Sequence, residues 1–514
     1  MDIPFDIPLG LALLAPAPML LLAVLVLSDR VKLTHAAWGS AVIAGVLAVT
    51  AFELPVAGLA SGAGKGAWTG LWILGVVVPG LLLFQVAETS GALERLSEQL
   101  TKLAPTRGRA TILFACVFPS FLQGAAGYGV PLAVTAPMAA KIFGPVVGIA
   151  TILVGYQWSV SFGSTGSPYF TTVAVAHLSQ ASAAEFAAYG AILVVINLCV
   201  AMALALWRSG SGIREVAVPA VVIALAMSVT LIATALIQPA IASLAAALVG
   251  LLVSAKLLPK GQTDVDWRLI TRSATPYIGL TVIIAVAFAI APVADLLDQV
   301  PAIAPAFDGS QAALGHVNEP VAAHQPFRPL QHPAVYLVVA ALGGIVAYRR
   351  FGWWPAGTTR QMTAAFWKRT KKTSPSVVGL TVLAGIMVEA GMVGAFATTL
   401  TALLGVGYLV VAPVLGTLGA TFTGSTTASN ALFAPLQVAA AQNLSMSETV
   451  MLAAQSTGAN VGNALTPVNA LIACVAVGAE GSEGKVLRKV LPAAGILMVV
   501  AVLSSAVLMW AVGM

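Results

Sequence analysis

Charged residues are scarce in this sequence: Asp, Glu, Lys and Arg make up 9% of its 514 residues, whereas 59% are hydrophobic. A soluble domain carries roughly 25% charged residues, so a soluble fold of this length could not cover its surface with this composition. The sequence therefore predicts an all-α polytopic membrane protein that lies in a lipid bilayer. At about 20 apolar residues per span, the apolar runs leave room for roughly twelve to fourteen membrane segments.

Cysteine is also scarce, and Cys116, Cys199 and Cys474 lie in apolar runs without CxxC spacing. We expect buried thiols there, neither metal ligands nor a disulfide framework. The N-terminal stretch has no basic segment, so no cleaved signal peptide is expected. The sequence lacks a GxxxxGK[ST] phosphate loop and has no cluster of His, Asp and Glu within the apolar runs. These absences argue against a primary pump and a membrane-embedded enzyme, and we expect no cofactor or bound metal.

Basic residues lie between the apolar runs, where the positive-inside rule expects cytoplasmic loops, so the net charge of +6 does not indicate nucleic-acid binding. Segment 349–372 is rich in Lys and Arg and has no acidic residue. Arg30 and Lys32 follow the first run and predict an N-terminus outside the membrane. Segment 299–332 has one basic residue and reads as an external loop. Its three histidines, at 316, 324 and 332, fit no standard metal-ligand spacing.

Residues 121–138, FLQGAAGYGVPLAVTAPM, interrupt an apolar region with Gly and Pro, and residues 421–436, TFTGSTTASNALFAPL, do the same. The two stretches belong to an internal repeat, because matched landmarks recur at offsets close to 300 residues. These landmark pairs are Gly91 and Gly391, Gly124 and Gly424, Pro137 and Pro435, and Pro168 and Pro467.

The basic loops predict that the two copies face opposite ways across the membrane. The run at 67–87 ends at a basic loop, whereas the equivalent run at 376–395 begins after one. Inverted repeats with broken segments at matching positions are typical of secondary transporters. Broken backbone at membrane depth is tolerated where protein shields it or where it lines a cavity. Its free N–H groups suit a carboxylate, so we expect two re-entrant or broken-helix hairpins that bind a small organic anion.

This pattern divides the chain into scaffold helices, two repeats and their connections. The predicted parts are N-terminal scaffold helices at 1–66, a first inverted repeat with hairpin 1 at 67–208, scaffold helices at 209–300, an external loop at 301–332, a connecting helix and basic cytoplasmic loop at 333–375, and a second inverted repeat with hairpin 2 at 376–514. Small and polar residues at the interruptions are the candidates for substrate binding. They are Gln123, Gly124, Ala125, Gly127, Tyr128, Gly129, Gly163, Ser164, Thr165, Thr423, Gly424, Ser425, Thr426, Thr427, Ser429, Asn430, Asn460, Asn463 and Thr466.

Ionisable residues that could couple transport to an ion are few. Glu88 and Glu389 each stand just before a matched glycine, and an ionisable group inside a membrane segment is a functional candidate by default. Glu94 and Arg95 follow Glu88 closely and favour an ordinary helix-end carboxylate there. Glu389 lies deeper in its apolar run and is the stronger candidate.

The two interrupted stretches, together with GANVGNALTPVNALIACVAVG at 458–478, resemble the L-lactate permease family, which includes glycolate permeases. The family pattern FLEGAAGFGAP corresponds to FLQGAAGYGVP here, and GSDTSSNALFA corresponds to GSTTASNALFA. The resemblance implies proton-coupled uptake of small 2-hydroxymonocarboxylates across the bacterial inner membrane. It also implies kinship with the ion-transporter superfamily, in which a mobile domain carries two re-entrant hairpins.

Two departures from the family pattern bear on coupling: Gln123 stands where the family has Glu, and Thr426 stands where it has Asp. Gln and Thr cannot exchange a proton near neutral pH, so either another group couples transport or the ion and substrate differ. Proton symport of a lactate- or glycolate-type anion is the leading hypothesis. The alternatives are a sodium-coupled carrier of another carboxylate or a sulfonate, favoured by the Asn and Thr residues of 455–466, and a passive anion channel. A homo-oligomer is expected only by analogy with elevator-like carriers.

Overall fold

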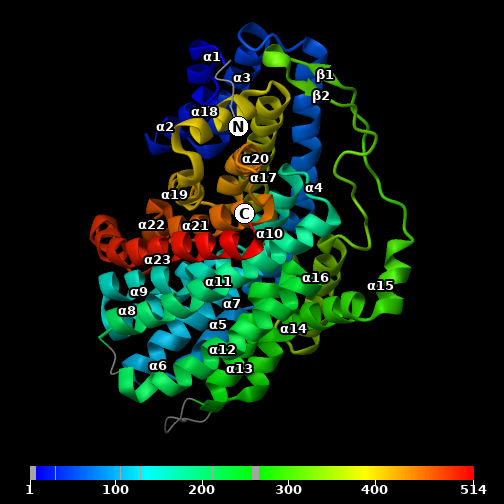
Figure 1. Ribbon diagram of the computed structural model, residues 1–514. Coiled ribbons are helices and arrows are strands. Elements are labelled where there is room, and N and C mark those ends of the chain that lie inside the picture. Colours follow the sequence, from blue (N-terminus) through cyan, green and yellow to red (C-terminus); the bar gives the residue numbers. More distant parts are fainter. Residues whose placement is uncertain are drawn as a thin grey trace.

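The computed structural model describes residues 7–28, 30–104, 106–127, 129–210, 213–257 and 265–513. Almost all described elements are helices, as the composition predicts (Figure 1). Within these ranges, ten helices are long and apolar enough to cross a membrane, and the bent pair Pro145–Val160 and Gly163–Val175 would make eleven. The expected twelve to fourteen spans exceed this number, because apolar helices such as Gly10–Val26 and Val130–Phe143 are too short to cross a bilayer.

The N-terminal helices and the first repeat come first along the chain. Their bounds are α1 (Leu9–Leu14), α2 (Ala17–Leu27), α3 (Leu33–Thr50), α4 (Val56–Thr89), α5 (Ala92–Thr101), α6 (Arg107–Thr111), the π-helix η1 (Ile112–Val117), α7 (Phe118–Ala125), α8 (Val130–Phe143), α9 (Pro145–Tyr156), the 3-10 turn η2 (Gln157–Val160), α10 (Gly163–Val175) and α11 (Gln180–Arg208).

The middle of the chain and the second repeat follow. Their bounds are α12 (Ile213–Ile237), η3 (Pro239–Ile241), α13 (Ala242–Leu257), α14 (Trp267–Ala289), α15 (Ala291–Asp298), β1 (Ser310–Gln311), η4 (Ala313–Gly315), β2 (Val317–Asn318), α16 (Pro333–Arg350), α17 (Thr358–Glu389), α18 (Met392–Leu404), η5 (Gly405–Gly407), α19 (Tyr408–Thr423), α20 (Thr426–Asn443), α21 (Glu448–Ala464), α22 (Pro467–Ala476) and α23 (Glu483–Val512).

The order of long elements after α4 recurs after α17. Helix α4 ends two residues before Gly91, and α17 ends two residues before Gly391. Both glycines have a left-handed backbone with φ of 72°. In the same order, α5 corresponds to α18, α7 to α19, α8 to α20, α9 to α21, α10 to α22 and α11 to α23. The element order therefore agrees with an internal repeat, while its inversion across the membrane stays a prediction.

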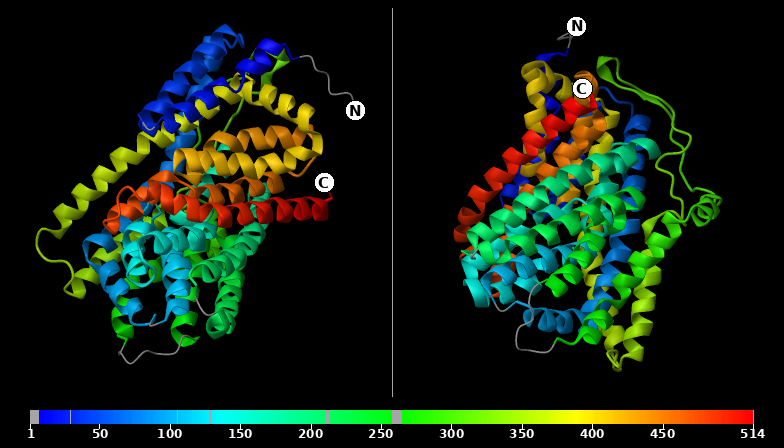
Figure 2. Two further views of the ribbon diagram at one scale, coloured as in Figure 1. Left: turned by 90° about the vertical axis from the view of Figure 1, so that its left-hand side faces the viewer. Right: turned by 60° about the horizontal axis from the view of Figure 1, so that its bottom comes forward.

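Helices α4 and α17, the first members of the two repeats, pack against each other in antiparallel directions. An added Cβ on Gly62 would meet Glu389, one on Gly66 would meet the Thr381 carbonyl, and one on Gly70 would meet Thr381 and Val378. The same small-residue packing joins α19 to α21, which lie side by side in both views of Figure 2. Close packing of this kind replaces the hydrophobic driving force that is absent between helices in a bilayer.

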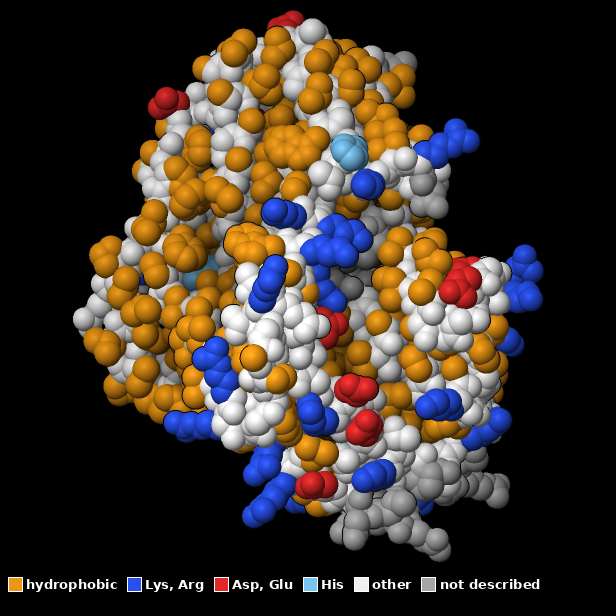
Figure 3. Space-filling view, turned by 180° about the vertical axis from the view of Figure 1, so that it is seen from behind, with side chains coloured by type: hydrophobic (Ala, Val, Ile, Leu, Met, Phe, Trp, Pro, Cys, Tyr) orange, Lys and Arg blue, Asp and Glu red, His pale blue; other side chains and the backbone are white. Residues whose placement is uncertain are grey.

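Apolar side chains cover much of the outer surface. Large hydrophobic residues such as Leu225, Val229 and Trp510 are exposed, as expected where lipid is the solvent. Figure 3 shows hydrophobic side chains over most of one face, with Lys and Arg gathered over its middle and lower parts. Cys116 and Cys474 are buried, but Cys199 is exposed, so the expectation of three buried thiols was wrong for Cys199. Its position on α11 is next to the exposed Ile196, on a face that needs no protein cover in lipid.

Residues 301–332, which we call the strap, form an irregular two-armed loop along α4 (right-hand side of Figure 1). Ile303 pairs with Phe327 and Phe307 with Val321 as antiparallel bridges, and β1 pairs with β2 near the tip. Two indole groups of α4 hold one arm, since Trp68 Nε1 donates to the Gln325 carbonyl at 3.0 Å and Trp72 Nε1 donates to the Pro326 carbonyl at 3.2 Å. The strap is therefore tied to α4.

The close contact between α4 and α17 can be tested by its effect on the stability of the protein. Gly66→Ala would press a methyl group against the backbone of α17, and the two helices would have to separate. We expect a loss of about 1–3 kcal/mol, typical of overpacking. The matched control is Gly343→Ala in α16, where an added Cβ meets no described atom within 4 Å; helix propensity predicts a gain of up to about 1 kcal/mol. Thermal unfolding of the purified proteins in detergent measures both changes, and equal unfolding temperatures would contradict the close packing.

Candidate functional site

The first break in the helices separates α7 from α8. Gly127 and Gly129 have left-handed backbones, with φ of 66° and 80°, which glycine adopts without steric cost. The candidate Tyr128 lies between them, outside the described residues. An added Cβ on Gly127 would collide with Ser164 Oγ and lie 3.2 Å from Gln123 Nε2. The glycine is therefore required both for the turn and for the approach of a second broken segment.

That second broken segment lies at the start of α10. Ser164, Thr165 and Gly166 are three consecutive residues with left-handed backbones, and φ is 48° and 54° for the first two. Such a conformation is rare for a β-branched residue and costs of order 1–3 kcal/mol at each non-glycine position. Neighbouring residues hold it in place, because the Gln123 side chain packs against Gly163 and Thr165 is fully buried. Strain held in this way is typical of binding sites.

The second repeat has equivalent breaks. Helix α19 ends at Thr423, Gly424 has a φ of 73°, and the Ser425 side chain caps α20 by accepting from the Ala428 N–H. The break between α21 and α22 falls at Thr466, whose hydroxyl donates to the Ala420 carbonyl at 3.2 Å and to the Gly462 carbonyl at 3.1 Å. The Thr466 hydroxyl thus ties the start of α22 to α19 and α21.

Polar side chains from the two repeats meet in one buried cluster, which we call the polar belt. Ser167 Oγ lies 3.2 Å from Thr427 Oγ1, and Asn430 Nδ2 donates to the Pro168 carbonyl at 3.2 Å. Further contacts join α21 to the end of α9, to η2 and to Ser161, which follows η2. Ser161 Oγ donates to Asn460 Oδ1 at 3.0 Å, Asn460 Nδ2 donates to the Trp158 carbonyl at 3.4 Å, and Tyr156 OH donates to Asn463 Oδ1 at 3.3 Å.

The structure brings together many of the predicted site residues, but not all. Gln123, Gly127, Gly163 and Ser164 form one contact group, with Thr165 next to it. From the second repeat, Thr427, Asn430, Asn460 and Asn463 form the contacts across the belt. Thr426 and Ser429 are buried beside them and donate to the carbonyls of Ala459 and Gly416.

Other predicted residues have local roles. Gly124 approaches the backbone of Leu244 in α13, so it faces a scaffold helix. Ala125 is buried at the end of α7, and Gly129 approaches Ile472 of α22. Thr423 bonds to the Gly419 and Ser425 carbonyls at its own helix end, and Gly424, Ser425 and Thr466 complete the turns described above. Glycine and hydroxyl residues in a sequence do not distinguish these packing roles from binding roles.

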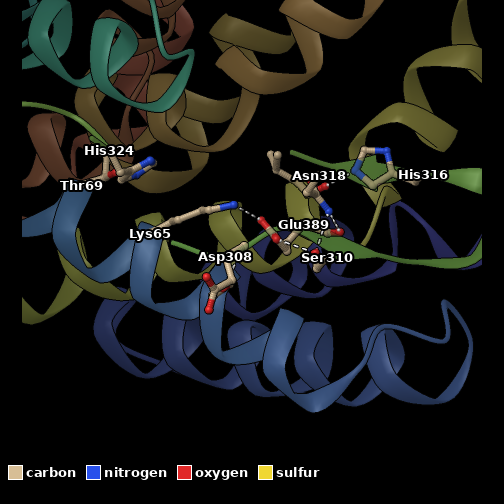
Figure 4. Close-up of polar contacts among 10 residues, drawn as sticks. Lys65, Thr69, Asp308, Ser310, His316, Asn318, His324 and Glu389 are labelled. Carbon is tan, nitrogen blue, oxygen red and sulfur yellow. Dashed lines mark hydrogen bonds and ion pairs between the residues drawn. The ribbon is translucent and has the colours of Figure 1, made fainter. Parts of the chain in front are cut away.

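The two coupling candidates differ sharply in environment. Glu88 is 41% exposed and forms an ion pair with Arg369 at 3.0 Å, as expected of a helix-end carboxylate. Glu389 is 3% exposed, and its Oε2 accepts a hydrogen bond from Lys65 Nζ at 2.8 Å (Figure 4). Its Oε1 accepts from Ser310 Oγ at 2.6 Å, and Asn318 Nδ2 donates to the Glu389 carbonyl at 2.8 Å. Glu389 is therefore bound to α4 and to the tip of the strap.

A cavity of about 500 Å³ lies beside this ion pair, between α4, α17, the end of α10 and the strap. Its polar lining comes from Lys65, Thr69, His177, Asn318, Glu319, His324, Gln325, Thr381 and Glu389. The sequence did not identify Lys65 as a candidate, and it did not predict that the rings of His177 and His324 lie together. Lys65 is the only charged residue of α4 before Glu88. It stands two residues before the predicted run at 67–87, and a lone lysine beside an apolar run is the signal that could have found it.

The two histidines of the cavity have their rings 4.9 Å apart. Burial, with the charges of Lys65 and the neighbouring ring, lowers the pKa of His177 to about 4, and burial lowers the pKa of His324. Both imidazoles are therefore neutral near pH 7. Among the described residues that line the cavity, Lys65 is then the one cation.

The ten long apolar helices among the described residues define a polytopic α-helical membrane protein, in which the breaks meet in a buried polar belt. The sequence profile described as L-lactate permease matches residues 11–512, and the chain belongs to this family. The L-lactate permease of Escherichia coli (strain K12) is 27% identical over 93% of this chain and 92% of its own length. The glycolate permease GlcA of the same organism is 27% identical over 93% and 92%. A solved structure, the Alcanivorax borkumensis YdaH transporter, has a TM-score of 0.49 and 18% identity, covering 86% of each chain.

The contact between the first two breaks can be tested at Gly127. Gly127→Ala combines a left-handed backbone, which costs a non-glycine residue about 1–2 kcal/mol, with a collision against Ser164. Gly352→Ala is the matched control, because its φ is 75° but no described atom lies within 4 Å of the added Cβ. We expect Gly127→Ala to destabilise the protein by about 1–3 kcal/mol more than the control. Thermal unfolding measures the difference, and equal losses would show that Gly127 and Ser164 are not in contact.

Proposed function

We propose that the protein is a secondary active transporter that imports a lactate- or glycolate-type 2-hydroxymonocarboxylate by proton symport. The observation that carries the proposal is the polar belt, in which broken helices from both repeats meet, in a chain of the L-lactate permease family. Relatives named for lactate and glycolate support the substrate class. We also propose a bacterial inner membrane location, with the N-terminus outside.

The belt suits a small hydroxy acid because it offers donors without fixed charge. Backbone N–H groups at the starts of α8 and α20, with the amide of Gln123 and the hydroxyls of Ser164 and Thr427, would face a carboxylate and its hydroxyl group. The belt is closely packed, with a void of only about 10 Å³ beside Ser161 and Ser456. Substrate therefore enters only if one repeat moves relative to the other, which is the alternating access expected of inverted repeats.

Sodium coupling is the second candidate, supported by the oxygen atoms around that void. Ser161 Oγ lies 3.1 Å from Ser456 Oγ and 3.0 Å from Asn460 Oδ1, and Thr457 lines the same space. Hydroxyl and amide oxygens are suitable ligands for a hard cation. This candidate predicts a dependence on sodium that proton symport does not. A passive channel would equilibrate the anion and show no accumulation under either gradient.

Uptake of labelled L-lactate into proteoliposomes tests the proposal, with proton and sodium gradients imposed separately. A proton gradient of one pH unit stores about 1.4 kcal/mol and supports about tenfold accumulation at a ratio of one proton per anion. We expect this accumulation under the proton gradient, none under the sodium gradient and none in protein-free liposomes. Accumulation driven by sodium alone would replace proton symport with the second candidate.

A further inference from the structure

The cavity beside Lys65 and Glu389 is separate from the polar belt. None of the predicted substrate-binding residues that the structure describes lines it, and it is the size of a small-molecule site. Its lining combines the Lys65 ammonium group and the carboxylates of Glu389 and the exposed Glu319 with uncharged donors and acceptors, among them Thr69, Asn318 and Gln325. A space of this size and lining suits a small anion, provided that the ammonium group is free to bind it.

The ion pair controls whether the ammonium group is free. While Glu389 is ionised, Lys65 Nζ is 2.8 Å from its carboxylate, and the pair has no net charge to attract an anion. Adding one proton to Glu389 leaves the pair with the single positive charge of Lys65, which balances the negative charge of one monocarboxylate; the exposed Glu319 is the other charged residue of the described lining. Moving Lys65 away from an ionised Glu389 would leave an uncompensated buried charge, which is strongly destabilising.

We propose that Lys65 binds the carboxylate of a small anion in this cavity, and that it does so in exchange for Glu389, which takes up one proton. The proton comes from water and forms an O–H bond on Glu389, while the Lys65 ammonium group keeps its three protons and moves from one carboxylate to another. No covalent bond to the anion forms. The inference rests on the proposed transport function: it adds a second anion site, apart from the polar belt, in which Lys65 binds the anion and Glu389 binds the proton.

The strap takes part in the same exchange. Ser310 Oγ, at the tip of the strap, donates to Glu389 Oε1 at 2.6 Å and accepts from Asn318 Nδ2 at 3.0 Å (Figure 4). Protonation of Glu389 weakens the charge-assisted bond from Ser310, since such bonds are about twice as strong as neutral ones. Anion binding therefore loosens the tip of the strap, which covers one side of the cavity.

The titratable groups that surround Glu389 come from every neighbouring element. Helix α4 contributes Lys65; the end of α10 contributes His177; the strap contributes Asp308, His316, Glu319 and His324. Helices α18 and α20 contain no Asp, Glu, Lys, Arg or His. Helix α3 contains one histidine, His35, and its neighbour Thr34 bonds to Ser376, which is 13 residues before Glu389 on α17. Of these groups, only Lys65 forms an ion pair with Glu389 among the described residues.

Anion binding to the purified full-length protein tests the exchange without relying on transport. The probes are L-lactate, glycolate, acetate and succinate, measured by isothermal titration calorimetry from pH 5.5 to 8.5 in buffers of different ionisation enthalpy. Linkage predicts uptake of one proton per anion, and a dissociation constant that rises about tenfold per pH unit wherever free Glu389 is ionised. We expect Glu389→Gln to bind without proton uptake and with no pH dependence. We expect Lys65→Gln to weaken binding at least tenfold at every pH.

The controls are substitutions of the same type at exposed positions: Glu98→Gln on α5 and Lys368→Gln on α17. Both should keep the proton uptake and affinity of the parent. Any one of three results would overturn the inference. They are binding that Lys65→Gln does not weaken, proton uptake that remains in Glu389→Gln, and no binding of any probe. If another probe binds with the expected pattern while L-lactate is neither bound nor accumulated, the exchange stands and the proposed substrate fails. Because we expect Glu389→Gln to bind the anion, a misfolded variant would not give the predicted result.

Discussion

Every interruption of a helix inside a bilayer has to be completed by protein, because lipid offers no hydrogen bonds to free N–H and C=O groups. This constraint explains why the breaks in the two repeats do not stand apart. The Asn430 amide bonds to the carbonyl of Pro168, and the Thr466 hydroxyl bonds to the Ala420 and Gly462 carbonyls. These side-chain bonds join the segments beside the breaks to one another, and the bond from Asn430 is part of the polar belt. A site built to satisfy backbone groups also presents the donors that an anion requires.

The sequence predicted the parts of this arrangement that depend on local chemistry. Gly91, Gly391 and Gly424 were matched by spacing, and all three have left-handed backbones. The interrupted stretches were placed correctly because glycine, proline and hydroxyl residues signal breaks wherever they interrupt an apolar run. The contact between Lys65 and Glu389 could not be predicted, because the two residues are 324 positions apart and neither has a neighbouring charge that marks it. The role of Gly124 against α13 depends on tertiary packing in the same way.

The ion pair is a costly element in a protein with so few charges. Removing two charges from water costs several kcal/mol per ion, which their attraction repays only with good geometry and additional hydrogen bonds. Ser310 and the close contact at 2.8 Å supply these conditions, yet a pair of apolar residues would fill the same space without the desolvation cost. Stability alone is a weak reason to keep such a pair, whereas the proposed exchange uses both of its members.

The cavity and the polar belt are connected by helices from both repeats. Helix α10 runs from the strained residues at 164–166 to Val175 and His177 at the cavity, and α20 runs from its cap at Ser425 to Pro435, which also lines the cavity. Each distance is about ten residues, or about 15 Å along a helix. Under the proposed exchange, a displacement of either helix at the cavity would also displace its end in the belt. Anion binding at the cavity and opening of the breaks would then be two effects of the same movement, with one helix from each predicted repeat transmitting it.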